Sequence, residues 1–233
     1  MKQAAIILIT HHNLGMTKDC LSSLIQNTGS PFKLFITENN SGPEMEAYLQ
    51  EQGFPYEKSD RDLSIGEAIN KGFHYFIKDD EVEYICWIHT DMLFAPRWLE
   101  NLVKIQEKYP SAGKVCSYNF VGAKEEFDPA AATKYMFDHR HVTYPGHNAP
   151  WLMKKSTVLE VGFFDENYRG CGGYEDWDYN QRILEKSYRI LQTDSSAVWH
   201  EGMGTRENID SHSDALFNLS YYKKRWGTTG PPV

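Results

Sequence analysis

Apolar runs rich in Ile, Val and Phe alternate along the chain with segments in which apolar residues recur every three or four positions. Short apolar runs are typical of buried strands, and the longer spacing is typical of helices with one buried face. Strands and helices that alternate in this order build a mainly parallel sheet with helices packed on its faces. The pattern therefore predicts an α/β fold with a Rossmann-like, mainly parallel central sheet flanked by helices.

The expected elements can be assigned residue ranges. Strands are expected at residues 4–10, 33–37, 83–89 and 114–118, and helices at residues 17–27 and 44–52 and from about Ile65 and Glu175 onward. A further helix is expected to hold Pro96 in its first turn, where a missing N–H is not needed. Its core face is Trp98, Leu99, Leu102, Val103 and Ile105, and that of the first helix is Cys20, Leu21, Leu24 and Ile25.

The pattern is weakest between Asn119 and Asn148, where glycines, prolines and three histidines are mixed with residues of varied polarity. A loop of this length is either part of a binding site or an ordinary surface connection, and both interpretations stay open. Regular patterning returns between Trp151 and Val161.

Length and charge narrow the class of protein. The chain has 233 residues, 41% of them hydrophobic, which is enough for one core, so residues 1–233 are expected to form a single domain. The formal net charge of -8 argues against a nucleic-acid-binding protein, because such binding depends on clustered Lys and Arg. A small anionic ligand would therefore need a bound cation.

Cysteine spacing and the first apolar run bear on the cellular compartment. The four cysteines have no CxxC spacing, which favours reduced thiols and a cytoplasmic location. The apolar run at residues 4–9 is much shorter than the roughly 20 residues that span a bilayer, and no small-residue cleavage site follows it. It is therefore interpreted as a buried strand.

Polar side chains follow three of the expected strands at the point where each strand ends. They are Thr10 after the first strand, Glu38 and Asn39 after the second, and the segment His89-Thr90-Asp91 after the inner strand. In open α/β sheets, ligands bind at the carboxyl ends of the strands. These residues are therefore candidates for one binding site.

The order of motifs resembles that of the family 2 glycosyltransferases with a GT-A fold, from the first strand nearly to Trp226. Residues 37–42 resemble the family's Asp-Asn-x-Ser segment, with Glu38 in place of Asp, and residues 65–72 its Gly-x-x-x-Ala-x-Asn-x-Gly segment. His89-Thr90-Asp91 occupies the place of the Asp-x-Asp metal motif, with His89 in place of the first Asp. The later matches are residues 162–166, 173–178, 199–202 and 222–227.

This resemblance implies a metal-dependent, inverting transfer of a sugar from a nucleotide-sugar donor, UDP-sugar foremost, to a hydroxyl of a glycan or lipid-linked acceptor, as in polysaccharide biosynthesis. Residues 1–118 would form the nucleotide-sugar-binding half and residues 119–233 the acceptor-binding half. Asp91 and His200 would bind Mn²⁺ or Mg²⁺, with Mn²⁺ preferred because a nitrogen ligand accompanies the carboxylate. The nucleotide-sugar-binding residues would be Thr10, Glu38, Asn39, Asn70, His89, Thr90 and Asp91.

An acceptor hydroxyl is a poor nucleophile, so direct displacement needs an ionised general base. Asp176 is the first candidate and Glu175 the second, because both lie at the start of a helix whose dipole favours a carboxylate. The same position also suits acidic residues that only stabilise the helix. Asp178 and Arg182 have the spacing of an ion pair on that helix.

Alternatives remain for several of these residues. Asp91 is also a suitable turn residue before Pro96, and His200 is also a suitable hydrogen-bonded residue at a strand end. The replacements at His89 and Glu38 leave open a relative that binds nucleotide sugar or glycan without turnover. A nucleotidyltransferase would need a Gly-rich, basic phosphate loop after the first strand, which is missing there.

Aromatic side chains have two interpretations as well. Trp151, Tyr174 and Trp177 suit stacking on sugar rings or packing in the core. The segment from Tyr221 to Trp226 mixes aromatic and basic side chains, so it fits either a weak peripheral membrane contact or a basic helix end.

Overall fold

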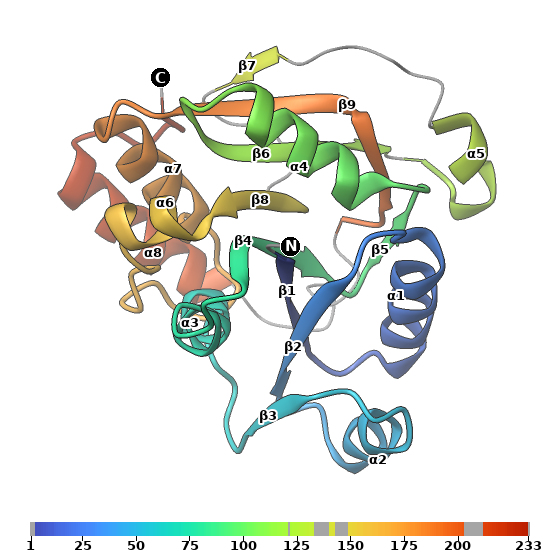
Figure 1. The fold of residues 1–233 in the computed structure, drawn as a ribbon. Helices are drawn as coiled ribbons and strands as arrows, with labels where there is room; N and C mark the ends of the chain where they lie inside the picture. The colour runs from blue at the N-terminus through green and yellow to red at the C-terminus, as the bar shows by residue number, and fades with distance from the viewer. Residues whose placement is uncertain (1–2, 121, 133–139, 143–148, 203–211, 233) are drawn as a thin grey trace.

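The computed structural model describes residues 3–120, 122–132, 140–142, 149–202 and 212–232. Within these ranges one nine-stranded sheet has the order β3-β2-β1-β4-β8-β6-β9-β5, and β7 pairs with β9 outside this path. Helices α3, α6, α7 and α8 lie on one side of the sheet and α1 on the other (Figure 1). The strands are β1 (Gln3–Thr10), β2 (Phe32–Asn39), β3 (Tyr56–Ser59), β4 (Val82–His89), β5 (Met92–Phe94), β6 (Ala112–Phe120), β7 (Arg140–Val142), β8 (Trp151–Lys154) and β9 (Arg189–His200). The helices are α1 (Leu14–Asn27), α2 (Pro43–Glu51), α3 (Ile65–Phe76), α4 (Trp98–Lys108), the 3-10 turn η1 (Lys124–Glu126), α5 (Pro129–Ala132), α6 (Lys155–Val161), α7 (Glu175–Glu185) and α8 (His212–Trp226).

The parallel part of the sheet confirms the predicted α/β fold. β1 runs parallel to β2 and β4, and the register places Thr10 beside Glu38 and Ile9 beside His89. The polar ends of three strands therefore meet at one edge of the sheet, as expected. β8 is the exception in the centre, because it pairs antiparallel with both β4 and β6.

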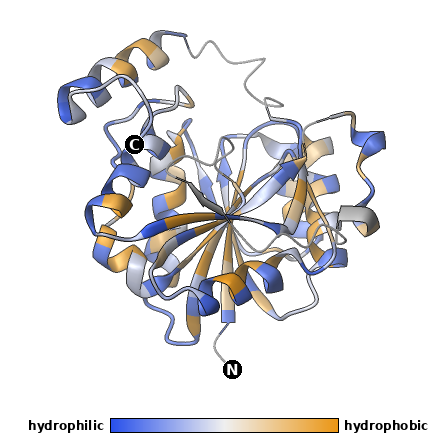
Figure 2. Ribbon diagram, turned by 90° about the horizontal axis from the view of Figure 1, so that it is seen from above, coloured by the Kyte–Doolittle hydropathy of each residue, from blue (hydrophilic) through white to orange (hydrophobic). Residues whose placement is uncertain are grey.

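The core lies on both faces of β1 and β4. Ile6, Ile7 and Leu8 are fully buried, and the strands carry most of the hydrophobic residues near the centre of the molecule (Figure 2). α3 packs closely against β1, since a Cβ added at Gly72 would lie 2.5 Å from Ile7 Cγ1. A capping box between Ser64 and Glu67 begins this helix at the residue that the sequence predicted.

Three details of the predicted elements were wrong or incomplete. Ile25 is 55% exposed, because it lies at the edge of the buried face of α1 rather than within it. Pro96 lies in a turn before the helix, which begins at Trp98 after Arg97 adopts a left-handed conformation. β3 and β5 were missed because β3 has exposed polar residues and β5 is only three residues long.

The loop expected between Asn119 and Asn148 is only partly covered by the described residues. They include η1, α5 and the short strand β7, whereas residues 121, 133–139 and 143–148 lie outside them. None of the helices in the described ranges has the length and apolar character needed to cross a bilayer.

Candidate active site

Two histidines and one aspartate meet where β4 ends. His89 is the last residue of β4, Asp91 follows two residues later, and His200 is the last residue of β9. β5 pairs antiparallel with β9 and sets Met92 opposite His200, which brings these distant parts of the chain together. Glu201 N–H also donates a hydrogen bond of 3.1 Å to the Asp91 carbonyl.

The three side chains have the geometry of a metal site. Asp91 Oδ1 lies 3.3 Å from His200 Nε2 and 3.7 Å from His89 Nδ1. One ligand atom of each residue lies within 4.8 Å of the others. Burial by itself raises the pKa of Asp91, but the hydrogen bond from His200 and the charges of both histidines lower it below the ordinary value. Asp91 therefore carries an ionised carboxylate, and a set of two imidazoles and one carboxylate could hold a divalent cation such as Mn²⁺.

The ends of β1 and β2 present buried polar atoms beside this cluster. Thr10 and Glu38 are fully buried, and Thr10 Oγ1 and Glu38 Oε2 have no hydrogen-bond partner among the described residues. The other carboxylate oxygen of Glu38 accepts a hydrogen bond of 2.5 Å from Ser41 N–H. Buried polar atoms in a native protein normally have partners. These two atoms are therefore suited to contacts with a ligand.

Asn39 and Asn70 have partners within the protein. Asn39 accepts a hydrogen bond of 2.7 Å from Leu63 N–H and donates one of 3.1 Å to the Leu63 carbonyl. Asn70 accepts from Phe164 N–H at 2.9 Å and donates to Glu166 Oε1 at 2.8 Å. Both side chains thus fix loops around the strand ends, and their contact with a nucleotide sugar stays a prediction.

The two candidate bases lie in the first turn of α7. Glu175 is buried, whereas Asp176 is half-buried and accepts a hydrogen bond of 2.8 Å from Trp177 N–H. Tyr174, just before the helix, has a φ of 74°. The helix dipole favours a carboxylate at this end, as the sequence suggested.

The glycine-rich turn before α7 is held by α8. The fully buried Asn218 accepts a hydrogen bond of 2.8 Å from Arg169 N–H and donates to the carbonyls of Arg169 and Gly173 at 3.0 and 2.9 Å. A Cβ added at Gly172 would lie 2.7 Å from Ala215 N. The lack of a side chain at this glycine thus lets α8 approach the turn closely.

Asp178 connects α7 with the end of α8. Its carboxylate pairs with Arg182 Nε at 2.9 Å, as predicted, and with Arg225 Nε at 3.1 Å. Trp226 Nε1 donates to the same carboxylate at 3.0 Å, and Tyr222 is fully buried. Tyr222 and Trp226 therefore pack against the protein itself, whereas Lys223 and Lys224 of the same segment are exposed.

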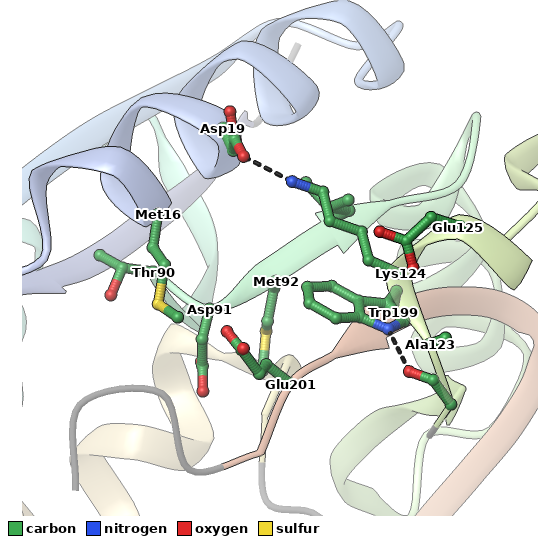
Figure 3. Close-up of a pocket in the computed structure, with 12 residues that line it drawn as sticks. Met16, Asp19, Thr90, Asp91, Met92, Ala123, Lys124, Glu125, Trp199 and Glu201 are labelled. Atoms are coloured by element: carbon green, nitrogen blue, oxygen red, sulfur yellow. Dashed lines mark hydrogen bonds and ion pairs between the residues drawn. The ribbon is translucent and has the colours of Figure 1, made fainter. Parts of the chain in front are cut away.

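A cavity of about 490 Å³ adjoins Asp91 on the side of α1. Figure 3 shows Met16 and Asp19 of α1 facing Trp199 and Lys124 across it. Lys124 Nζ forms an ion pair of 2.6 Å with Asp19, and Trp199 Nε1 donates a hydrogen bond of 2.9 Å to the Gly122 carbonyl.

Of the three aromatic candidates, Trp151 is buried, whereas Tyr174 and Trp177 are half-buried. Trp151 is fully buried, so it belongs to the core. Tyr174 and Trp177 contact the ring of Tyr222, with centroid distances of 5.8 and 5.7 Å. Sequence reasoning missed Lys114, a buried lysine under α7, although a lone Lys within the apolar strand at residues 114–118 was a visible signal.

Comparison with solved structures defines the class of fold. The crystal structure of GalNAc-T7 with UDP, GalNAc and Mn²⁺ superposes with a TM-score of 0.74 at 13% sequence identity, covering 97% of this chain and 48% of that chain. The chain thus spans about half the length of that protein and has the GT-A glycosyltransferase fold. No match was found among curated proteins.

Residues 5–157 match glycosyl transferase family 2. The chain belongs to this family, as the order of its motifs indicated.

Proposed function

We propose that this protein is a glycosyltransferase that moves a sugar from a UDP-sugar to a hydroxyl of a glycan or lipid-linked acceptor, with inversion and with a divalent cation, in polysaccharide biosynthesis. The residues 1–118 would bind the donor and the residues 119–233 the acceptor within one domain. A cytoplasmic location, with at most weak membrane contact, belongs to the same proposal.

The cluster of His89, Asp91 and His200 is the observation that carries this proposal. A bound Mn²⁺ or Mg²⁺ would neutralise the charge that develops on the leaving diphosphate. The three side chains fit such a cation, because they lie within reach of one another and include a buried, ionised carboxylate. The replacement of the family's first Asp by His89 therefore leaves the cluster with three potential ligands.

The donor nucleotide is proposed to lie over the ends of β1 and β2. The buried atoms Thr10 Oγ1 and Glu38 Oε2 would then hydrogen-bond to the ribose or the base. A UDP donor is supported by the likeness to the GalNAc-T7 structure, which contains UDP and Mn²⁺. His89, Thr90 and Asp91 would face the diphosphate, while Asn39 and Asn70 would shape the pocket through the loops that they hold.

Asp176 is proposed to accept the proton of the acceptor hydroxyl while that oxygen attacks the anomeric carbon and the nucleoside diphosphate leaves. Direct displacement of this kind inverts the configuration of that carbon. Asp176 is more exposed than Glu175, which is 4% exposed. It is therefore the better placed of the two to meet an acceptor, and Glu175 is the alternative.

Thermal melting with UDP and Mn²⁺ tests the metal-dependent donor site. We expect UDP and Mn²⁺ together to raise the melting temperature of the wild-type protein, because a ligand at about 100 times its Kd stabilises the folded state by about 2.7 kcal/mol. UDP with EDTA should leave the melting temperature unchanged. Asp91→Asn and His200→Ala should lose this shift. Asp80→Asn, a change at an exposed carboxylate just before β4, at the opposite end of that strand from the site, should retain it and serves as the control. An undiminished shift in both Asp91→Asn and His200→Ala contradicts the proposed site.

A further inference from the structure

A lysine is buried in the middle of the sheet where an apolar residue would be expected. Lys114 lies on β6, where residues 112–117 are all buried, and its own side chain is 1% exposed. Charged side chains are almost never buried to this extent unless they have partners, because the loss of hydration disfavours the ion. The partners of Lys114 should therefore indicate the role of this residue.

The contacts of Lys114 lead to the helix that carries the candidate bases. Its Nζ donates a hydrogen bond of 2.7 Å to Asn180 Oδ1 of α7 and lies 5.6 Å from the centre of the Trp151 ring. Asn180 is itself fully buried. Because residues four apart lie on the same face of a helix, Asn180 and Asp176 share the face of α7 that meets Lys114.

Lys114 and Asp176 also interact electrostatically. Burial lowers the pKa of Lys114, while the nearby Cys116 and Asp176 act in the opposite direction. Burial raises the pKa of Cys116 to about 11, so this thiol is protonated at neutral pH. Asp176 thus lies close enough to favour the charged form of Lys114, while burial, the larger effect, keeps the pKa of Lys114 below its ordinary value.

We propose that Lys114 is a positioning residue that holds the first two turns of α7 against β6 and thereby fixes Asp176 for proton transfer. This inference rests on the proposed function, in which Asp176 is the base. Lys114 acts through its hydrogen bond to Asn180, so it is not a catalytic residue itself. A small displacement of a catalytic group lowers the rate of the chemical step far more than it lowers substrate affinity.

The test compares Lys114→Met with the wild type by steady-state kinetics and by hydrogen–deuterium exchange of residues 175–180. We expect kcat to fall by at least about tenfold while the KM for the donor changes by less than about threefold. The amides of residues 175–180 should also exchange at least about fivefold faster. Lys114→Arg, which keeps a cationic donor for Asn180, should recover part of kcat.

Gln106→Met is the matched control. Gln106 is fully buried too, and its Nε2 donates a hydrogen bond of 2.6 Å to the Ala112 carbonyl at the start of β6, but among the described residues it forms no hydrogen bond with α7. The variant Gln106→Met should lower the melting temperature and leave kcat close to that of the wild type. If Lys114→Met does not fold, Asn180→Ala removes the acceptor of the lysine and takes its place.

Unchanged exchange at residues 175–180, or a kcat equal to that of the wild type, overturns the positioning role. A wild-type protein without turnover for any donor would count against the proposed function instead. In that case the hydrogen–deuterium exchange of residues 175–180 is the only test of the positioning role.

Discussion

At the scale of single residues, the position of each polar side chain at the end of a strand decides what it can contact. Thr10, Glu38 and His89 lie at the ends of three neighbouring parallel strands. Their place at one edge of the sheet could be predicted, because parallel strands end on the same side. That His200 lies near Asp91 was expected only from the family resemblance, because no local pattern marks the three-residue strand β5 that brings them together.

Asp176 and Glu175 can be separated by single substitutions. Asp176→Asn should lower kcat by about 10²- to 10⁴-fold, because an amide cannot accept the proton of the acceptor hydroxyl. Binding of UDP with Mn²⁺, measured by calorimetry, should stay within about twofold of the wild type. Glu175→Gln is the paired variant, and the reverse outcome, with Glu175→Gln inactive and Asp176→Asn active, transfers the role of base to Glu175.

Glu38→Gln tests the donor site independently of the metal. The substitution preserves the shape of the side chain but removes the charge that would strengthen a hydrogen bond to the nucleotide. We expect the Kd for UDP to rise by roughly tenfold, equivalent to about 1.4 kcal/mol. Glu44→Gln, at an exposed position in α2, provides the control. Equal UDP affinities in the wild type and Glu38→Gln would place the nucleotide elsewhere.

At the scale of elements, the long helices and buried strands could be predicted and their contacts with one another could not. The helical spacing in α3 and the apolar run of β4 are local signals. The contact between Asn218 and the turn before α7 joins residues about fifty positions apart, so no local pattern contains it. Gly172 of that turn is packed against α8, a contact that likewise depends on residues far apart in the sequence.

Gly172→Ala tests this packing. Because the added Cβ would meet the backbone of α8 at Ala215, we expect a loss of about 1–3 kcal/mol in the free energy of unfolding, measured by chemical denaturation. Gly15→Ala is the matched control, since its Cβ would approach no atom closer than 3.7 Å in the exposed first turn of α1. It should leave stability unchanged or raise it slightly. Equal stabilities of the two variants would refute the close contact.

At the scale of the whole molecule, the sheet joins the proposed donor and acceptor halves into one framework. β4 and β6 are linked through β8, and β9 returns to end beside Asp91. This arrangement sets the ends of β1, β2, β4 and β9 around one edge. The sequence predicted the sheet and its edge, because alternating strands and helices specify them.

Release of nucleoside diphosphate is the measurement that tests the central claim most directly. Wild-type protein would be incubated with UDP-, GDP- and dTDP-sugars and a panel of glycan and lipid-linked acceptors, each with Mn²⁺, with Mg²⁺ and with EDTA. We predict release from a UDP-sugar that depends on the metal and on an acceptor, and that is lost in Asp91→Asn. Binding of UDP with no release under any of these conditions would contradict the account and identify a protein that binds its donor without turnover.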